Sequence, residues 1–275
     1  AEVYANRIDS HNKREWRVLD MVAPSLGLED EIGEYPLFVK PDRLLSVHDI
    51  FLISGDHYEG TKWDLTKGVG AGPWGDPLTN YGIGGRQRPI GIPLTCYLHI
   101  AQVKEWLPRE FRGISWYGYG SVGHSYLTPL FPAMEKLPDF YSVGSRYEKF
   151  RRDSGWWVNT YVQEMVGMRY SEAIKELRAF REPKMASVYA QTAQLQEYAA
   201  MMYRQGNPKE AVKLMSDFCY HTAVGWNQDW LDLGDRLFTK YATERINFGS
   251  AGYPTWWQDW LNPAKNPELL KYANK

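Results

Sequence analysis

Two segments in the first half of the chain read RPIGIPLTCYLHIAQV (88–103) and GISWYGY (113–119). Both are rich in β-branched, apolar and aromatic residues, a composition typical of strands. The intervening EWLPREFR (105–112) contains charges and a proline, which predicts a connection. We therefore expect a pair of strands at 88–103 and 113–119.

The sequence changes character beyond about residue 146. Asn207-Pro208 is a typical helix start, and the apolar pattern after it continues to Leu237. Strands followed by helices predict an α+β fold, with a strand-rich part at 1–145 and a mainly helical part at 146–275. The earlier apolar positions at helical spacing are Trp156, Val158, Tyr161, Val162, Met165, Ala173, Ile174, Leu177, Leu195, Tyr198, Ala199 and Met202.

Shorter elements are expected before the strands. Residues 3–5 resemble the end of a strand, and Asp9 or Ser10 can cap a helix that Pro24 and Gly27 end. A second short helix is predicted from Pro41-Asp42 to Gly55. Residues 55–85 carry too many glycines for a regular element, which predicts a loop shaped around a site.

Composition limits the class of protein. With 275 residues the chain can bury one large core with an appendage. Lys and Arg total 32 against 33 for Asp and Glu, so nothing indicates a nucleic-acid partner. No run approaches the roughly 18–20 apolar residues that a spanning helix needs, which argues against membrane insertion.

Polar residues beside the glycine-rich loop are candidates for a site. Asp56-His57-Tyr58-Glu59 combines two carboxylates with an imidazole that could bind a charged substrate terminus or a metal, or could form a solvated turn. Arg86 and Arg88 lie where the loop enters the first strand. Either guanidinium could pair with a carboxylate in a pocket wall or lie on the surface.

The cysteines and two further histidines favour structural roles. Cys96 lies in a predicted strand and Cys219 in a predicted helix, so both are expected to be buried rather than nucleophilic. His99 and His124 have no neighbouring Ser or Cys in a nucleophile setting. Two cysteines alone do not identify the redox compartment.

A longer run carries a resemblance to a known family. HYEGT (57–61), WDLTKG (63–68) and AGPWGDP (71–77) resemble, in this order, a segment of the dipeptidases of peptidase family C69. YANRI (4–8), residues 88–103 and GISWYGYGSVGHSYLTPLF (113–131) are similar to further segments, as is SGWW (154–157). The resemblance covers roughly residues 3–240.

The resemblance implies an N-terminal-nucleophile hydrolase, in which an N-terminal Cys attacks an amide and its own α-amino group is the base. Position 1 here is Ala. The chain would then be the second half of an αββα sandwich with a C-terminal helical extension, and the nucleophilic Cys would lie on a separate N-terminal chain. A fragment or a diverged, non-catalytic subunit is the alternative.

The same resemblance suggests roles for individual residues. Asn6 matches an oxyanion donor, and Arg88 occupies the place of an Arg beside the nucleophile, with Arg86 as the competing assignment. His57, Glu59 and Arg86 would line the substrate pocket. No metal or organic cofactor is required.

The function expected is therefore dipeptide hydrolysis by a two-chain enzyme, with a higher homo-oligomer possible. One alternative is a hydrolase of another amide, such as those of bile salts or penicillins. The other is a structural or binding subunit of a larger assembly. A periplasmic or secreted location is favoured over the cytoplasm.

Overall fold

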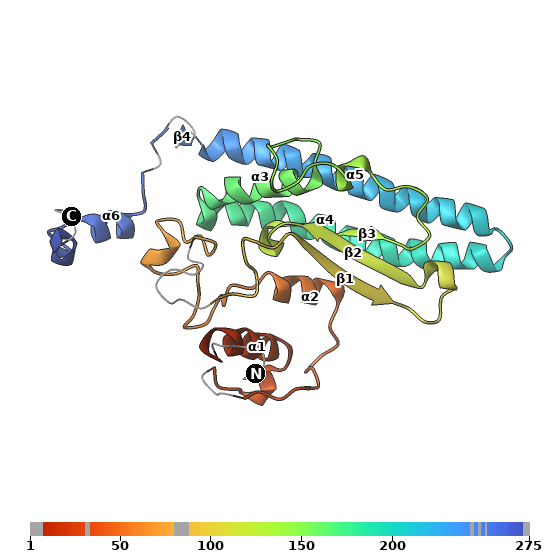
Figure 1. The fold of residues 1–275 in the computed structure, drawn as a ribbon, viewed down its shortest axis with the longest axis horizontal. Helices are drawn as coiled ribbons and strands as arrows, with labels where there is room; N and C mark the ends of the chain where they lie inside the picture. The colour runs from red at the N-terminus through yellow and green to blue at the C-terminus, as the bar shows by residue number, and fades with distance from the viewer. Residues whose placement is uncertain are drawn as a thin grey trace.

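A computed structural model describes residues 8–30, 34–79, 88–242, 245–246, 249–250 and 252–271. In Figure 1 the long helices of the second half of the chain run alongside one another, a small sheet lies against them, and the N-terminal helices lie at the lower edge of the view. The structure mixes helices with an antiparallel sheet, which confirms the α+β class. The predicted strand end at residues 3–5 lies outside the described residues.

The sheet contains β1 (Tyr97–Val103), β2 (Gly113–Tyr119) and β3 (Thr128–Leu130), antiparallel and in that order. Both predicted strands are present, but the first begins at Tyr97 and not at residue 88. Pro89 and Pro93 explain the difference, because proline cannot donate to a strand ladder. Gly91 instead donates its backbone N–H to the carbonyl of Asp56 at 3.0 Å.

The two faces of the sheet have different environments. Ile114 and Trp116 of β2 are buried, and β2 and β3 contact the helical layer. The opposite face presents Tyr97, His99 and Val103 of β1, all exposed. β1 is also an edge strand, paired only with β2 among the described strands.

The helical layer consists of α3 (Gly155–Gly167), α4 (Tyr170–Arg204) and α5 (Pro208–Tyr241), and the predicted helix start at Asn207-Pro208 is present. α4 and α5 are joined by Gln205–Asn207 and pack along each other (Figure 1). Tyr126, which precedes β3, stacks on Trp226 of α5 with ring centroids 4.9 Å apart and planes 7° apart. Helices and strands therefore share one apolar core.

The N-terminal part contains α1 (Ile8–Val22) and α2 (Val47–Ser54). α1 agrees with the predicted helix, whereas α2 begins at Val47 and not near Pro41. Ser46 sets this start, because its side chain accepts from the Asp49 N–H while the Asp49 carboxylate accepts from the Ser46 N–H. The glycine-rich segment is a loop over its described residues 55–79.

The remaining elements are short. β4 (Arg245–Ile246) pairs with β5 (Gly249–Ser250), and α6 (Thr255–Leu261) lies outside the main body in Figure 1. Across the described residues, no helix combines the length and apolarity required to cross a bilayer. Short 3₁₀ turns occur at Pro24–Leu26, Val69–Ala71, Arg109–Phe111, Val122–His124, Asp139–Tyr141 and Pro267–Lys271.

Two glycines of α5 provide a test of the packing. A Cβ at Gly234 would lie 2.5 Å from Cε1 of Tyr161 in α3, whereas a Cβ at Gly225 would meet nothing within 4 Å. Both Gly→Ala changes gain about 1 kcal/mol of helix propensity. We expect Gly225→Ala to raise the free energy of unfolding, and Gly234→Ala to lower it by about 1–3 kcal/mol through overpacking. Urea unfolding of both variants measures this, and equal stabilisation would contradict the α3–α5 packing.

Candidate functional site

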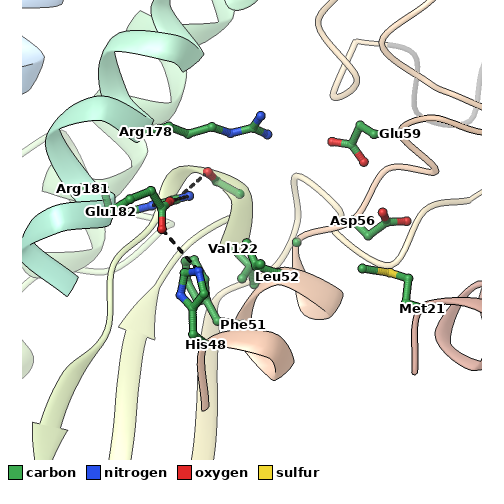
Figure 2. Close-up of a pocket in the computed structure, with 12 residues that line it drawn as sticks. Met21, His48, Phe51, Leu52, Asp56, Glu59, Val122, Arg178, Arg181 and Glu182 are labelled. Carbon is green, nitrogen blue, oxygen red and sulfur yellow. Dashed lines mark hydrogen bonds and ion pairs between the residues drawn. The ribbon is translucent and has the colours of Figure 1, made fainter. Parts of the chain in front are cut away.

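A pocket of about 530 Å³ lies where α1, α2, the turn at 122–124 and α4 meet (Figure 2). Its walls combine apolar side chains with several charges, as ligand pockets usually do. We call it the α2–α4 pocket. Its lining residues are Met21, His48, Phe51, Leu52, Gly55, Asp56, Glu59, Val122, Gly123, Arg178, Arg181 and Glu182.

The α4 wall is fixed by Arg181, whose side chain is 2% exposed. Its Nη1 donates to the carbonyls of Gly123 and Ser125 at 2.8 and 3.0 Å. Its Nε and Nη2 donate to Oε1 of Glu182 at 2.9 and 2.6 Å. Burial lowers the pKa of this guanidinium, although Glu182 opposes the shift. The Arg181 guanidinium therefore fixes α4 to the turn at 123–125, and these contacts occupy its Nε, Nη1 and Nη2.

The opposite wall is fixed by a second arginine. Arg17 of α1 donates its Nε and Nη2 to the two carboxylate oxygens of Asp56 at 2.9 and 2.8 Å. Asp56 Oδ1 also accepts from the backbone N–H of Tyr58, which has a positive φ of 65°. Such a backbone is costly for an aromatic residue and persists only when its surroundings hold it. The Asp56–Glu59 turn is therefore well defined.

Glu59 lies at the end of this turn and is held by His57. Its Oε2 accepts from the His57 backbone N–H at 2.6 Å, and its Oε1 lies 3.1 Å from His57 Nδ1. Burial would raise the pKa of Glu59, but these hydrogen bonds and the His57 charge outweigh it and lower the pKa to about 2. Glu59 is therefore a carboxylate at physiological pH.

Arg178 approaches from α4, one turn before Arg181. Figure 2 shows its guanidinium pointing across the pocket toward the Glu59 carboxylate. The side chain is exposed, and no hydrogen bond or ion pair joins it to another side chain in the described part of the chain. The pocket thus has an anionic group on one side and a cationic group on the other.

Buried titratable groups lie near His57. Burial, reinforced by the proximity of His57 and Arg181, lowers the pKa of His124 to about 3, so that this ring is neutral. Burial raises the pKa of Asp76 to about 6 even though its carboxylate accepts from the backbone N–H of Leu78. No group of three or more metal-ligating side chains occurs within the described ranges.

The structure brings together only some of the predicted site residues. Glu59 lines the pocket and His57 lies buried beside it. The Arg88 side chain is half-buried and outside the pocket lining, although its carbonyl accepts from the Tyr58 hydroxyl at 2.7 Å. Asn6 and Arg86 lie outside the described residues.

Sequence reasoning missed the contribution of α4. Arg178, Arg181 and Glu182 are spaced three and four residues apart, which places them on one helix face. This spacing of charged residues was the signal available in the sequence, but solvent-exposed helix faces have the same spacing. Of the cysteines, Cys219 is buried as predicted, whereas Cys96 is only partly buried, contrary to expectation.

The chain is similar in sequence to known peptidases. A sequence model of peptidase family C69 matches residues 4–183. The probable dipeptidase A of Streptococcus pyogenes serotype M3 is 27% identical over 151 residues, which cover 55% of this chain and 30% of that protein. Dipeptidase A of Lactobacillus helveticus is 24% identical over 240 residues, covering 84% of this chain and 47% of that protein. The chain thus matches less than half the length of these relatives.

The raised pKa of Asp76 predicts a pH-dependent effect on stability. Its folded pKa of about 6 exceeds the ordinary value of 3.8, so the stability that Asp76 contributes is present below pH 3.8 and lost as pH rises through 6. We expect Asp76→Asn to be nearly neutral at pH 4 and to stabilise by about 2 kcal/mol at pH 7.5. Chemical unfolding at both pH values measures this.

The exposed Asp139 provides the matched control. Asp139→Asn should change the free energy of unfolding equally little at both pH values. A stabilisation by Asp76→Asn that is the same at pH 4 and pH 7.5 would show that ionisation of Asp76 is not its cause.

Proposed function

Because the chain belongs to peptidase family C69, we propose that it forms the C-terminal part of a cysteine dipeptidase whose nucleophile lies on a separate N-terminal chain. Membership rests on the family match over residues 4–183. The relatives described above are named dipeptidases, and each is longer than the region that this chain matches. Both observations support a role within a larger peptidase.

The exposed edge and exposed face of the sheet are the observation that carries the two-part proposal. β1 presents an unpaired edge among the described strands and an exposed face with Tyr97, His99 and Val103. Native proteins usually cover such edges, because unpaired backbone groups attract other strands. A second sheet packed on this face would give the αββα sandwich of N-terminal-nucleophile hydrolases.

The cysteines of this chain support a nucleophile located elsewhere. Cys219 is fully buried in α5, and burial raises the pKa of its thiol to about 12, the opposite of what a nucleophile needs. Cys96 is absent from the lining of the α2–α4 pocket.

The proposed reaction proceeds through an acyl-enzyme. The cysteine of the N-terminal chain attacks the peptide carbonyl, its α-amino group takes the thiol proton, and Asn6 stabilises the oxyanion of the tetrahedral intermediate. The resulting α-ammonium gives that proton to the departing amine, which leaves a thioester, and water then hydrolyses the thioester to release the acid and restore the free thiol. Arg88, or alternatively Arg86, would favour the thiolate, and the pocket containing Glu59 would hold the substrate. The mechanism needs no metal or organic cofactor.

The test uses the complete protein, purified with every chain that accompanies it, and L-alanyl-L-alanine as substrate. We expect hydrolysis, and a loss of more than about 100-fold after iodoacetamide treatment, because the thiolate is the nucleophile. Intact mass and N-terminal analysis should identify a companion chain that begins with Cys.

The Cys96→Ser/Cys219→Ala double variant is the control. It should retain activity and remain sensitive to iodoacetamide, because the reacting thiol lies on the other chain. Absence of a companion chain together with absence of activity would favour a structural or binding subunit instead.

A further inference from the structure

We propose that Arg178 and Glu59 bind the two ends of a zwitterionic ligand, with Arg178 on the carboxylate and Glu59 on the ammonium. The assignment of that ligand as a dipeptide substrate rests on the proposed function, whereas the binding itself does not. The two groups reach into the α2–α4 pocket from opposite sides, one from α4 and one from the turn after α2 (Figure 2).

The remaining charges of the pocket are already engaged. Asp56 is bound by Arg17 through both carboxylate oxygens. Glu182 accepts from Arg181 and lies 3.4 Å from Nε2 of His48. These pairs satisfy one another, so they provide little attraction for a ligand.

Glu59 also has a side-chain partner, but that partner is the imidazole of His57 and not an arginine or lysine. Arg178 has no hydrogen bond or ion pair with another side chain among the described residues. No ion pair joins Glu59 and Arg178, although both side chains are described. Glu59 receives two contacts from His57, which leaves lone pairs on its carboxylate for a further donor. The Arg178 guanidinium retains its planar set of donors, which matches a carboxylate in a bidentate contact. A ligand ammonium would donate to the Glu59 carboxylate, and a ligand carboxylate would accept from the Arg178 guanidinium.

The two groups are held on rigid elements. Glu59 is oriented by His57, which is 1% exposed, and by the Asp56–Tyr58 turn. Arg178 precedes by one helical turn the Arg181 anchor that fixes α4 to residues 123 and 125. The Glu59 carboxylate is therefore preorganised and loses little entropy on binding, whereas the Arg178 side chain becomes ordered only when the ligand binds. Phe51, Leu52 and Val122 provide apolar walls for the body of the ligand.

The ligand class follows from this arrangement. A molecule with opposite charges at its two ends satisfies both groups at once, whereas blocking either end leaves one group unpaired in a partly enclosed pocket. The volume of about 530 Å³ lies in the range of small-molecule sites. Free dipeptides fit this description, and N-acetylated or C-amidated dipeptides do not.

The binding test uses 5-aminopentanoate, which has the same number of bonds between its charged ends as a dipeptide and contains no hydrolysable bond. Pentanoate and pentylamine each carry one of the two charges. In calorimetric titrations of the complete protein, we expect Arg178→Gln to weaken 5-aminopentanoate and pentanoate about 10–100-fold and to leave pentylamine unchanged. Glu59→Gln should weaken 5-aminopentanoate and pentylamine and leave pentanoate unchanged.

Matched variants separate this effect from a loss of folding. Lys175→Gln removes an exposed charge one turn earlier on α4 and should behave as the wild type. Arg178→Lys should restore part of the pentanoate affinity. Arg178 is exposed, so its substitution should leave the thermal unfolding temperature unchanged, and the Arg178 variants suffice if Glu59→Gln does not fold.

Kinetics distinguish failure of this inference from failure of the proposed function. In an active enzyme, Arg178→Gln should raise KM for L-alanyl-L-alanine and have little effect on KM for its C-terminal amide. Hydrolysis with unchanged KM and unchanged 5-aminopentanoate affinity in both variants would overturn the inference and leave the dipeptidase proposal standing. Binding of 5-aminopentanoate that depends on Arg178, in a protein that does not hydrolyse L-alanyl-L-alanine, would support the inference and overturn the dipeptidase proposal.

Discussion

The guanidinium of Arg181 is removed from water and holds the layers of the molecule together. It binds two backbone carbonyls of the turn between β2 and β3 while it pairs with Glu182 of its own helix. A buried charge is costly unless its donors are satisfied, so these contacts restrict α4 to one position against the turn. The sheet, the helical layer and one wall of the pocket all depend on that position.

A second arginine has the same role on the other wall. Arg17 holds Asp56, Asp56 holds the backbone of Tyr58, and the resulting turn delivers Glu59. Each wall of the pocket is therefore held in place by one arginine–carboxylate pair. Each also presents one further charged side chain to the pocket, Glu59 on one wall and Arg178 on the other. A pocket built in this way keeps its shape without a ligand, because the groups that define it do not depend on one.

The sequence predicted the parts of the fold that depend on local pattern. The helices after residue 146, the start at Pro208 and the glycine-rich loop follow from spacing and capping. The predicted start of the first strand, at residue 88, was wrong because Pro89 and Pro93 cannot donate a hydrogen bond to a neighbouring strand, although the residues around them have a strand-like composition. In the site, His57 and Glu59 could be found because they are adjacent to the loop. The α4 side chains become neighbours of Glu59 only through tertiary packing, which no local pattern records.

The α4–α5 hairpin also affects how the chain reaches its fold. Its two helices are joined by Gln205–Asn207, so they can meet by a short search along the chain. The sheet joins them through contacts between distant residues, such as Arg181 to Gly123, 58 residues apart, and Gln196 to Phe111, 85 residues apart. Contacts close in sequence form faster than distant ones. The hairpin should therefore form first and provide the surface on which the strands collect, so the pocket is completed late in folding.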